Sequence, residues 1–279
     1  MSSDDIEATI ERAREASRRD DLDGKVAIVT GAGTRGGDGV GNGAATAILL
    51  ARQGAKVTLV DKEPEWMEIT ERIIEEEGGD YLSLEGDVTD PDDCRRIVEE
   101  TVSRFGALHV LHNNVGGGAP RESVERASFD TWEKSISINL LSAVSMSKYA
   151  VPYIRECGGG SILNVSSATA LRPKRDGSSA PYTTTKSAMM GLTRAMARDH
   201  GGDRIRVNCL LPGLIWTPGI ARHLADEREK RNEATPYALE GSPWDVGWTA
   251  VFLASERARF ITGAAIPVDG GFLLTAANH

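Results

Sequence analysis

The sequence predicts an α/β protein with a single doubly wound parallel sheet of about seven strands and helices on both faces. Short apolar segments rich in β-branched residues alternate with helical segments along most of the chain. A glycine-rich turn and a helix follow the first of these strands. Several later strands end in polar or small residues, which is typical of parallel sheets that bind ligands beyond the carboxyl ends of their strands.

The first strand–helix–strand unit occupies residues 25–61. An apolar run predicts a buried strand, a turn dense in glycine follows it, and a helix-forming run ends at Gly54, a residue typical of helix C-caps. The elements are expected at Lys25–Thr30, Gly31–Gly43, Ala44–Gln53 and Lys56–Val60. The second strand leads directly into Asp61. A strand, a glycine turn, a helix, a second strand and an acid in this order form a dinucleotide-binding fingerprint.

The alternation continues to the end of the chain. Asp90-Pro91 indicates an N-cap followed by a proline in the first helical position, and Gly78-Gly79 ends the helix before the third strand. Helices are expected at about Pro64–Glu77, Pro91–Phe105, Asp130–Arg155, Pro181–His200 and Trp244–Ala254, and strands at Tyr81–Glu85, Leu108–His112, Ser161–Val165, Ile205–Leu210 and Ala265–Val268. The repeats predict one Rossmann fold.

The residue types at this unit suit a nicotinamide dinucleotide. Glycines let the backbone approach a pyrophosphate, which the amides and the positive end of the next helix hold. The carboxylate of Asp61 can accept hydrogen bonds from both hydroxyls of the adenine ribose and would repel a 2′-phosphate, so NAD is expected and NADP is less favoured. Lys62 and Arg35 are basic neighbours, and either could face such a phosphate.

Composition limits the partners. The chain has 279 residues, 26% of them charged, and a net charge of −9. This balance lacks the positive field that attracts nucleic acid or anionic membranes, so neither is expected as a partner. Cys94, Cys157 and Cys209 are widely spaced, which favours reduced core thiols over disulfides. No His/Cys cluster has the spacing of metal ligands, so no metal is expected.

Residues 1–23 are expected to form a polar N-terminal extension before the dinucleotide-binding catalytic domain at 24–279. Asp4–Arg18 could form a helix with a thin apolar stripe, and a tail lying on the surface is the expectation. The extension lacks the apolar core of a signal peptide, and no later segment is long enough to span a bilayer. A cytoplasmic protein is expected.

Tyr182 and Lys186 lie four residues apart at the start of an expected helix, and therefore on one face of it. A tyrosine hydroxyl titrates near pH ~10, and a fixed ammonium nearby lowers its pKa. Each unit of lowering corresponds to about 1.4 kcal/mol in favour of the phenolate. The pair predicts an acid/base group active at physiological pH, and the preceding strand ends in Ser166-Ser167.

Together these residues resemble the short-chain dehydrogenases/reductases over about Leu22–Phe272. The similarity includes Thr30-Gly31 with the glycine turn, Gly86-Asp87-Val88, Asn113-Asn114-Val115-Gly116, Asn139, Ser167, Tyr182 with Lys186, Pro212-Gly213 with Thr217, and Val268-Asp269-Gly270-Gly271. The resemblance implies an NAD-dependent oxidoreductase that interconverts a secondary alcohol and a ketone. It also implies a homotetramer or homodimer, built from the two long helices and the final strand.

The resemblance assigns the catalytic roles. Tyr182 would be the general acid/base, and Ser167 would orient the same substrate oxygen. Lys186 would lower the pKa of the tyrosine and bind the nicotinamide ribose. Asn139 would hold a water that relays the proton to solvent, although an asparagine satisfied by helix backbone fits the same position.

The resemblance also implies the cofactor contacts. Asp87 and Val88 would meet the adenine, and Asn114 and Gly116 the ribose and backbone side. Ile215 and Thr217, after Gly213, would orient the carboxamide. Asp87 could instead be a strand-end turn residue, and Thr217 a helix N-cap before Pro218. The full expected set is Gly31, Gly33, Gly41, Asn42, Gly43, Asp61, Asp87, Val88, Asn114, Gly116, Tyr182, Lys186, Gly213, Ile215 and Thr217.

The glycine turn departs from the family pattern because extra residues lengthen it around Arg35–Val40. The second and third family glycines could be Gly39 and Gly41, or Gly41 and Gly43. We favour Gly41 and Gly43, since their distances to Gly54 and Asp61 suit the helix and the usual spacing of the acid.

A substrate lid is expected at about 213–242. Its apolar residues Trp216, Ile220 and Leu224 favour an alcohol or ketone with a hydrophobic body, whereas Arg222 and Arg228 allow a carboxylate. Two alternative functions remain: an epimerase or dehydratase that uses NAD transiently, and a catalytically silent dinucleotide-binding regulator. The complete set of Ser167, Tyr182 and Lys186 argues against the regulator.

Overall fold

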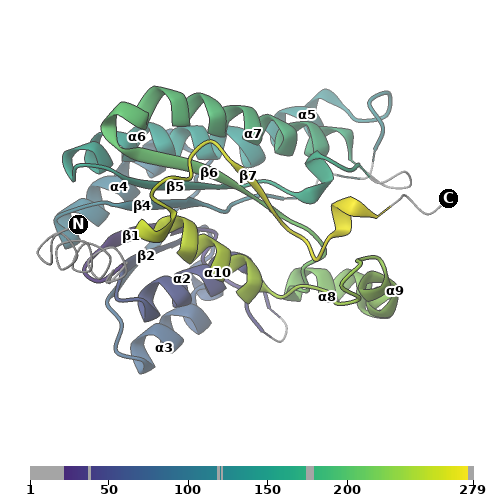
Figure 1. Cartoon of the computed structure of the whole chain (residues 1–279), viewed down its shortest axis with the longest axis horizontal. Coiled ribbons are helices and arrows are strands. Elements are labelled where there is room, and N and C mark those ends of the chain that lie inside the picture. The colour runs from purple at the N-terminus through teal and green to yellow at the C-terminus, as the bar shows by residue number, and fades with distance from the viewer. Residues whose placement is uncertain (1–21, 37–38, 118–119, 121, 174–178, 276–279) are drawn as a thin grey trace, which may run out of the picture.

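The computed structural model describes residues 22–36, 39–117, 120, 122–173 and 179–275. Within these ranges the chain forms a seven-stranded parallel sheet in the order β3-β2-β1-β4-β5-β6-β7 (Figure 1). The strands are β1 (Val26–Thr30), β2 (Lys56–Asp61), β3 (Tyr81–Glu85), β4 (Val110–Asn113), β5 (Gly160–Val165), β6 (Ile205–Pro212) and β7 (Ala265–Val268). The predicted doubly wound parallel sheet is confirmed.

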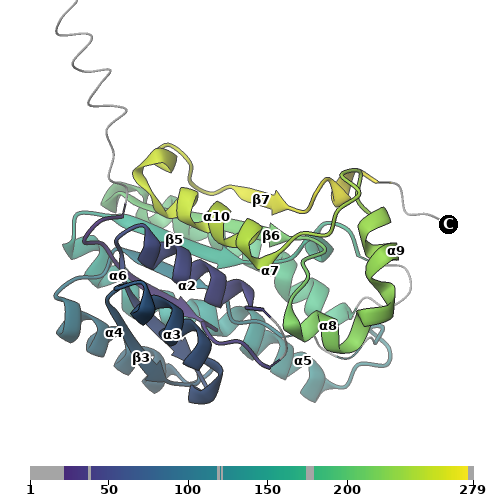
Figure 2. The ribbon, with the colours of Figure 1, turned by 90° about the horizontal axis from the view of Figure 1, so that it is seen from below.

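Helices cover both faces of the sheet. On one face lie α2 (Asn42–Arg52), α3 (Glu68–Glu76) and α10 (Pro243–Ala254); on the other lie α4 (Pro91–Phe105), α6 (Ser142–Glu156) and α7 (Ala180–His200) (Figure 2). The sequence of β1 is apolar without alternation because both faces of this strand are buried. Ala27 and Val29 pack toward α2 and α10, whereas Val26 and Ile28 pack toward α4 and α6. Each buried aliphatic side chain contributes about 1.5–3 kcal/mol.

The predicted helix starts agree with the caps in the structure. The Asp90 side chain accepts a hydrogen bond from the Asp92 amide at 2.9 Å, with Pro91 in the first helical position of α4. Ser179 caps α7 in the same way through the Tyr182 amide at 3.3 Å. These local bonds set the start of the helix that carries Tyr182 and Lys186.

Three expectations need correction. The predicted helix Asp130–Arg155 is α5 (Phe129–Ile136) and α6, joined by a π-helical turn at Ser137–Leu141 that contains Asn139. The first part of the helix predicted from Pro64 is a separate 3₁₀ turn, Pro64–Trp66, ahead of α3. Cys94 and Cys209 are buried as expected, but Cys157 is exposed because it lies at the C-cap of α6.

The strand order reverses between β1 and β4, and this position determines where a ligand can bind. The chain leaves β1 toward β2 on one side and returns to β4 on the other, so the loops after β1 and β4 diverge from a common crevice. Residues 213–242, where a substrate lid is predicted, contain α8 (Pro218–Leu224) and α9 (Arg228–Glu233), which lie at the end of the molecule where β6 exits (Figure 1). A bridge between Ile215 and Gly241 closes the base of the lid.

The expected N-terminal helix Asp4–Arg18 lies outside the described residues, so the boundary at residue 23 stays a prediction. Within the ranges that the structure describes, no helix is both long enough and apolar enough to cross a bilayer.

Candidate active site

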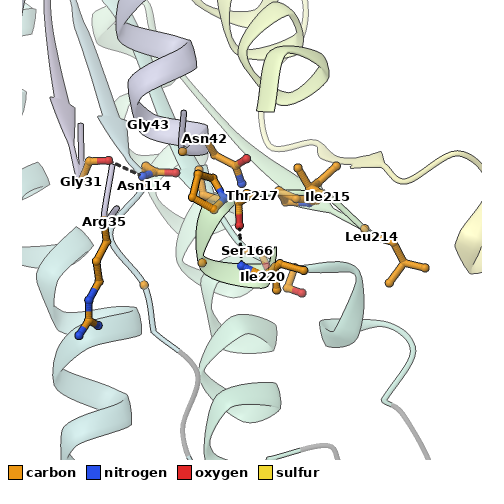
Figure 3. A pocket seen from close by; sticks show the side chains of 18 of the residues that line it. Gly31, Arg35, Asn42, Gly43, Asn114, Ser166, Leu214, Ile215, Thr217 and Ile220 are labelled. Carbon is orange, nitrogen blue, oxygen red and sulfur yellow. Dashed lines mark hydrogen bonds between the residues drawn. The ribbon is translucent and has the colours of Figure 1, made fainter. Parts of the chain in front are cut away.

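Two adjoining cavities of about 480 and 600 Å³ open at the carboxyl ends of the strands. They share Gly31, Arg35, Asn114 and Gly116. Of the residues expected in the site, the first cavity is lined by Gly31, Gly33, Gly41, Asn42, Gly43, Asn114, Gly116, Ser167, Tyr182, Lys186, Gly213, Ile215 and Thr217 (Figure 3). The second is lined by Gly31, Asp61, Asp87, Val88, Asn114 and Gly116. Sequence positions 31 to 217 therefore converge on one crevice, and only Asn139 lies just behind its wall.

Gly39, Gly41 and Gly43 of the first turn have different structural roles. A Cβ atom on Gly43 would lie 2.0 Å from the Gly31 carbonyl oxygen, so only glycine allows α2 to approach β1 this closely. Gly41 is the N-cap of α2, and its amide donates to Thr34 Oγ1 at 3.0 Å. Gly39 has a φ of +94° in open space. The helix start thus uses Gly41 and Gly43, while Gly39 provides a left-handed turn before it.

The start of α2 fits the phosphates of a dinucleotide. No side chain caps the helix, and its first turn holds no acidic residue. Free amides at the positive end of a helix, in a cavity wall, attract an anion. The residues present therefore fit the cofactor that the resemblance implies.

Asn114 fastens the loop after β4 to the loop after β1. Its Nδ2 atom donates to the carbonyls of Thr30 at 3.2 Å and Gly31 at 3.1 Å, and its amide donates to Thr30 Oγ1 at 3.1 Å. The side chain thus supports the glycine turn, while the residue itself lines both cavities (Figure 3).

Asp61 lies at the end of β2 beside the second cavity. Its Oδ2 atom accepts from the Gly33 amide at 3.0 Å and its Oδ1 atom from the Lys62 amide at 2.9 Å. Burial raises the pKa of Asp61, and these backbone hydrogen bonds oppose the shift. The guanidinium of Arg35 lies 5.2 Å from the centre of the Trp66 ring in the same cavity. An acid and a cation thus face the same space.

Asp87 and Val88 line the far part of the second cavity. Asp87 Oδ1 accepts hydrogen bonds from the Thr89 amide at 2.9 Å and the Thr89 hydroxyl at 2.7 Å. Its carboxylate therefore performs the strand-end turn role that the sequence left open, and the adenine contact stays a prediction. Val88 is buried and its carbonyl accepts from the Cys94 thiol.

Ser167, Thr169 and Tyr182 meet at the exit of β5. Ser167 Oγ accepts from the Thr169 hydroxyl at 2.9 Å and from the Thr169 amide at 3.3 Å. Both bonds occupy the acceptor side of the serine oxygen, which leaves its own proton to donate. Ser167 also hydrogen-bonds Tyr182, and this bond lowers the pKa of the phenol.

Lys186 is buried beside Tyr182. Its Nζ atom donates to the Val165 carbonyl at 2.8 Å and lies 5.9 Å from the centre of the Tyr182 ring. Burial lowers the pKa of Lys186 to about 8. A Cβ atom on Gly116 would lie 2.6 Å from Nζ, so the absence of a side chain at Gly116 makes room for the ammonium.

The pKa of Tyr182 differs from the sequence expectation. The expected lowering is not found: burial raises the pKa of the Tyr182 phenol, and the hydrogen bond with Ser167 only partly opposes this. The physical reason is that a charged phenolate loses more by desolvation than the nearby groups return.

Asn139 lies in the π-helical turn, and its side chain is satisfied by backbone. Its Oδ1 atom accepts from the Gly117 amide at 3.0 Å, and its Nδ2 atom donates to the Gly117 carbonyl at 3.1 Å and the Ser135 carbonyl at 3.1 Å. These bonds hold the loop after β4 against α5 and the π-helical turn. The water relay at Asn139 stays a prediction.

Gly213, Ile215 and Thr217 follow β6 into the lid. A Cβ atom on Gly213 would lie 2.6 Å from Asp269 Cβ, which explains the glycine. Thr217 Oγ1 accepts from the Ile220 amide at 3.3 Å, so the threonine stabilises the start of α8 as the alternative interpretation predicted (Figure 3). Its side chain still lines the first cavity.

Several residues of this cavity were missed by the sequence analysis, among them Thr169 and Arg231, which carry polar side chains. Thr169 stands two residues after Ser167, a spacing typical of a Ser/Thr turn that could have signalled it. Arg231 reaches the cavity from α9, and no local pattern distinguishes it from the other basic residues of the lid.

Comparison with known proteins agrees with this geometry. A family model described as enoyl-(acyl carrier protein) reductase matches residues 38–273. An uncharacterized short-chain type dehydrogenase/reductase of Sinorhizobium fredii is 34% identical over 91% of this chain and 99% of its own length. Cyclohexanol dehydrogenase of an Acinetobacter strain is 35% identical over 89% of this chain and 94% of its own.

Among solved structures, L-sorbose reductase of Gluconobacter frateurii in complex with NADPH and L-sorbose superposes with a TM-score of 0.83. It is 31% identical, and the match covers 93% of this chain and 100% of that one. Fold and site thus define an oxidoreductase that uses a nicotinamide dinucleotide. The chain belongs to the short-chain dehydrogenase/reductase family.

Proposed function

We propose that this protein is an NAD-dependent oxidoreductase that interconverts a secondary alcohol and a ketone, with Tyr182 as the general acid/base. One observation carries the proposal: Tyr182, Ser167 and Lys186 line one cavity, with Tyr182 hydrogen-bonded to Ser167 and its ring 5.9 Å from Lys186 Nζ. Tyr182 and Lys186 come from α7, and Ser167 caps the 3₁₀ turn Ala168–Ala170 directly after β5, so ordered elements position all three side chains.

The residues divide the chemistry between them. A bound nicotinamide supplies the group that accepts or donates the hydride. Tyr182 takes the proton from the alcohol oxygen, or returns a proton to the carbonyl oxygen in the reverse direction. Ser167 donates a hydrogen bond to the same oxygen and orients it. Lys186 holds a positive charge beside the phenol, which favours the phenolate against the cost of burial.

The test is Tyr182→Phe, assayed with a panel of secondary alcohols by the absorbance of the reduced nicotinamide. We expect kcat to fall roughly a hundredfold to ten-thousandfold while NAD binding, measured by calorimetry, stays unchanged. Tyr153→Phe in α6 is the matched control, because Tyr153 lies outside both cavities. Full activity of Tyr182→Phe would remove Tyr182 from its assigned role.

For the cofactor we favour NAD over NADP. Asp61 in the second cavity supports this choice, because a carboxylate there repels a 2′-phosphate. Arg35 and Lys62 line the same cavity and supply the specific reason to test NADP as the second candidate. The relative L-sorbose reductase was solved with NADPH, so both cofactors belong in the assay.

Two other functions are less well supported. An epimerase or dehydratase, or a silent dinucleotide-binding regulator, agrees less well with the relatives, which are named as dehydrogenases and a reductase. A cytoplasmic homotetramer or homodimer is also proposed. Leu141 and Val144 at the start of α6 are exposed apolar residues that such an interface would cover. Light scattering coupled to gel filtration tests the assembly, and a monomeric mass would contradict it.

A further inference from the structure

Helix α9 of the lid turns one charged side chain inward. Arg228, Glu229 and Lys230 are exposed, whereas the side chain of Arg231 is only 9% exposed. Burying a guanidinium costs several kcal/mol unless it is paired and hydrogen-bonded. The buried guanidinium of Arg231 therefore requires partners that compensate for its lost hydration.

Arg231 is paired within the lid and tied to the strand exit. Its Nε atom donates to Glu240 Oε1, and Glu240 is itself only 2% exposed. The Arg231 Nη2 atom donates to the Ile215 carbonyl at 3.4 Å. The arginine thus joins α9, the segment that ends the lid and the segment that follows β6.

One amino group of Arg231 remains available. The structure gives its Nη1 atom no hydrogen-bond partner among the described residues, yet this atom is not one of the fully buried polar atoms. Arg231 lines the cavity that also contains Ser167 and Tyr182. The free amino group therefore has access to that cavity.

The packing of α9 places Arg231 on the side of the serine. Ala234, three residues further along, packs against a small cluster formed by Ala168, Leu214 and Phe272. Ala168 directly follows Ser167. Residues three apart on a helical turn share a face, so Arg231 and Ala234 both face the side of the cavity that Ala168 and Ser167 occupy.

The charges favour an uncharged partner. Glu240 already neutralises the guanidinium, and a substrate carboxylate would bring a second negative charge to the same buried place. A hydroxyl, carbonyl or ether oxygen adds no charge and accepts one charge-assisted hydrogen bond. The Glu240 Oε2 atom has no partner in the described part of the chain, so the pair is not optimised for stability alone.

We propose that Arg231 determines substrate specificity: its guanidinium, positioned by Glu240 and the Ile215 carbonyl, binds a second, uncharged oxygen of the substrate. The substrate class is a diol, a hydroxyketone or a polyol, and hydroxy acids are disfavoured. This inference rests on the proposed function, because it needs an alcohol oxygen at Tyr182.

The test uses matched sets of substrates built on a cyclohexane ring, a linear chain and a fused ring system. Each set holds a mono-alcohol, a diol and a hydroxy acid. Because Arg231→Met alone would leave Glu240 charged and unpaired, the main variant is Arg231→Met/Glu240→Gln. Arg231→Lys is the second variant, since it keeps the charge and loses the forked donor geometry. Lys230→Met is the matched control, exposed on the same helix.

The readout is the ratio of kcat/KM for the diol to kcat/KM for the mono-alcohol in the best set. We expect wild type to prefer the diol, and the ratio to fall about tenfold or more in the double variant and in Arg231→Lys, but not in Lys230→Met. Thermal melting identifies a variant that does not fold. If the double variant does not fold, the ratio measured for Arg231→Lys tests the inference. Turnover with an unchanged ratio, or a wild-type preference for hydroxy acids, overturns the inference alone. No turnover of any alcohol removes the proposed function and the inference together.

Discussion

The Ser167 side chain receives two hydrogen bonds from a single residue, Thr169, through its hydroxyl at 2.9 Å and its amide at 3.3 Å. Since both bonds end on the serine oxygen, the serine proton is directed away from Thr169 and toward the cavity. Thr169 is therefore a positioning residue for the single hydrogen bond that the Ser167 hydroxyl can donate into the cavity.

Thr169→Val should lower kcat by about threefold to tenfold, which corresponds to one neutral hydrogen bond. The substitution keeps the shape of the side chain and removes only the hydroxyl, so NAD binding should not change. Thr169→Ser restores the donor and should restore kcat. A Thr169→Val enzyme with wild-type kcat would show that the amide alone positions Ser167.

Gly116→Ala should reduce activity while the fold survives. The added Cβ atom would stand 2.6 Å from Lys186 Nζ and 3.0 Å from Asn139 Oδ1. The lysine end can move, so the cost in stability is small, but the ammonium leaves its place beside Tyr182. A displacement of about 1 Å near the chemistry can cost on the order of a hundredfold in rate.

Gly117→Ala is the matched control for this prediction, because its Cβ atom would only touch Ile138 Cγ2 at 3.9 Å. Steady-state kinetics and a thermal melt of both variants suffice. Equal activity of the two variants would mean that the Lys186 ammonium tolerates displacement.

Asp61→Ala should weaken NAD binding and raise the ratio of kcat/KM for NADP to that for NAD by about tenfold. Removing the carboxylate takes away a repulsive charge and leaves Arg35 and Lys62 in the same cavity. Asp61 also accepts the Gly33 amide, so Asp61→Asn, which keeps an acceptor there, separates charge from turn structure. A cofactor ratio unchanged in both variants would overturn the role of Asp61.

His112 should make the protein sensitive to acid. It is fully buried in β4, neither ring nitrogen has a partner within the described residues, and burial lowers its pKa from 6.5 to about 3. At a pH between these two pKa values, His112 binds a proton in the unfolded chain but stays neutral in the folded protein. The free energy of unfolding therefore decreases as the pH falls from 6.5 toward 3.

His112→Leu removes this proton-binding group and the unpartnered polar atoms, and it should stabilise the protein more at pH ~5 than at pH ~8. Urea unfolding at both pH values measures the difference. His200→Gln, at the partly exposed end of α7, is the control for loss of a histidine. A stabilisation that is the same at both pH values would refute the prediction.

Short-range patterns account for what the sequence predicted well. The apolar run of β1, the Asp90-Pro91 cap and the Tyr182/Lys186 spacing depend on residues within a few positions of one another, so each could be interpreted locally. The convergence of strand ends on one crevice follows from parallel topology alone, which explains why thirteen of the expected residues line a single cavity.

The tertiary structure alone decided interactions between distant segments. The Asn114 clamp on Gly31 joins residues 83 positions apart, and the pairing of Arg231 with Glu240 and the Ile215 carbonyl depends on how the lid folds back on β6. The direction of the Tyr182 pKa shift also belongs here. Desolvation depends on what the whole fold packs around the phenol, and no spacing along the chain encodes that.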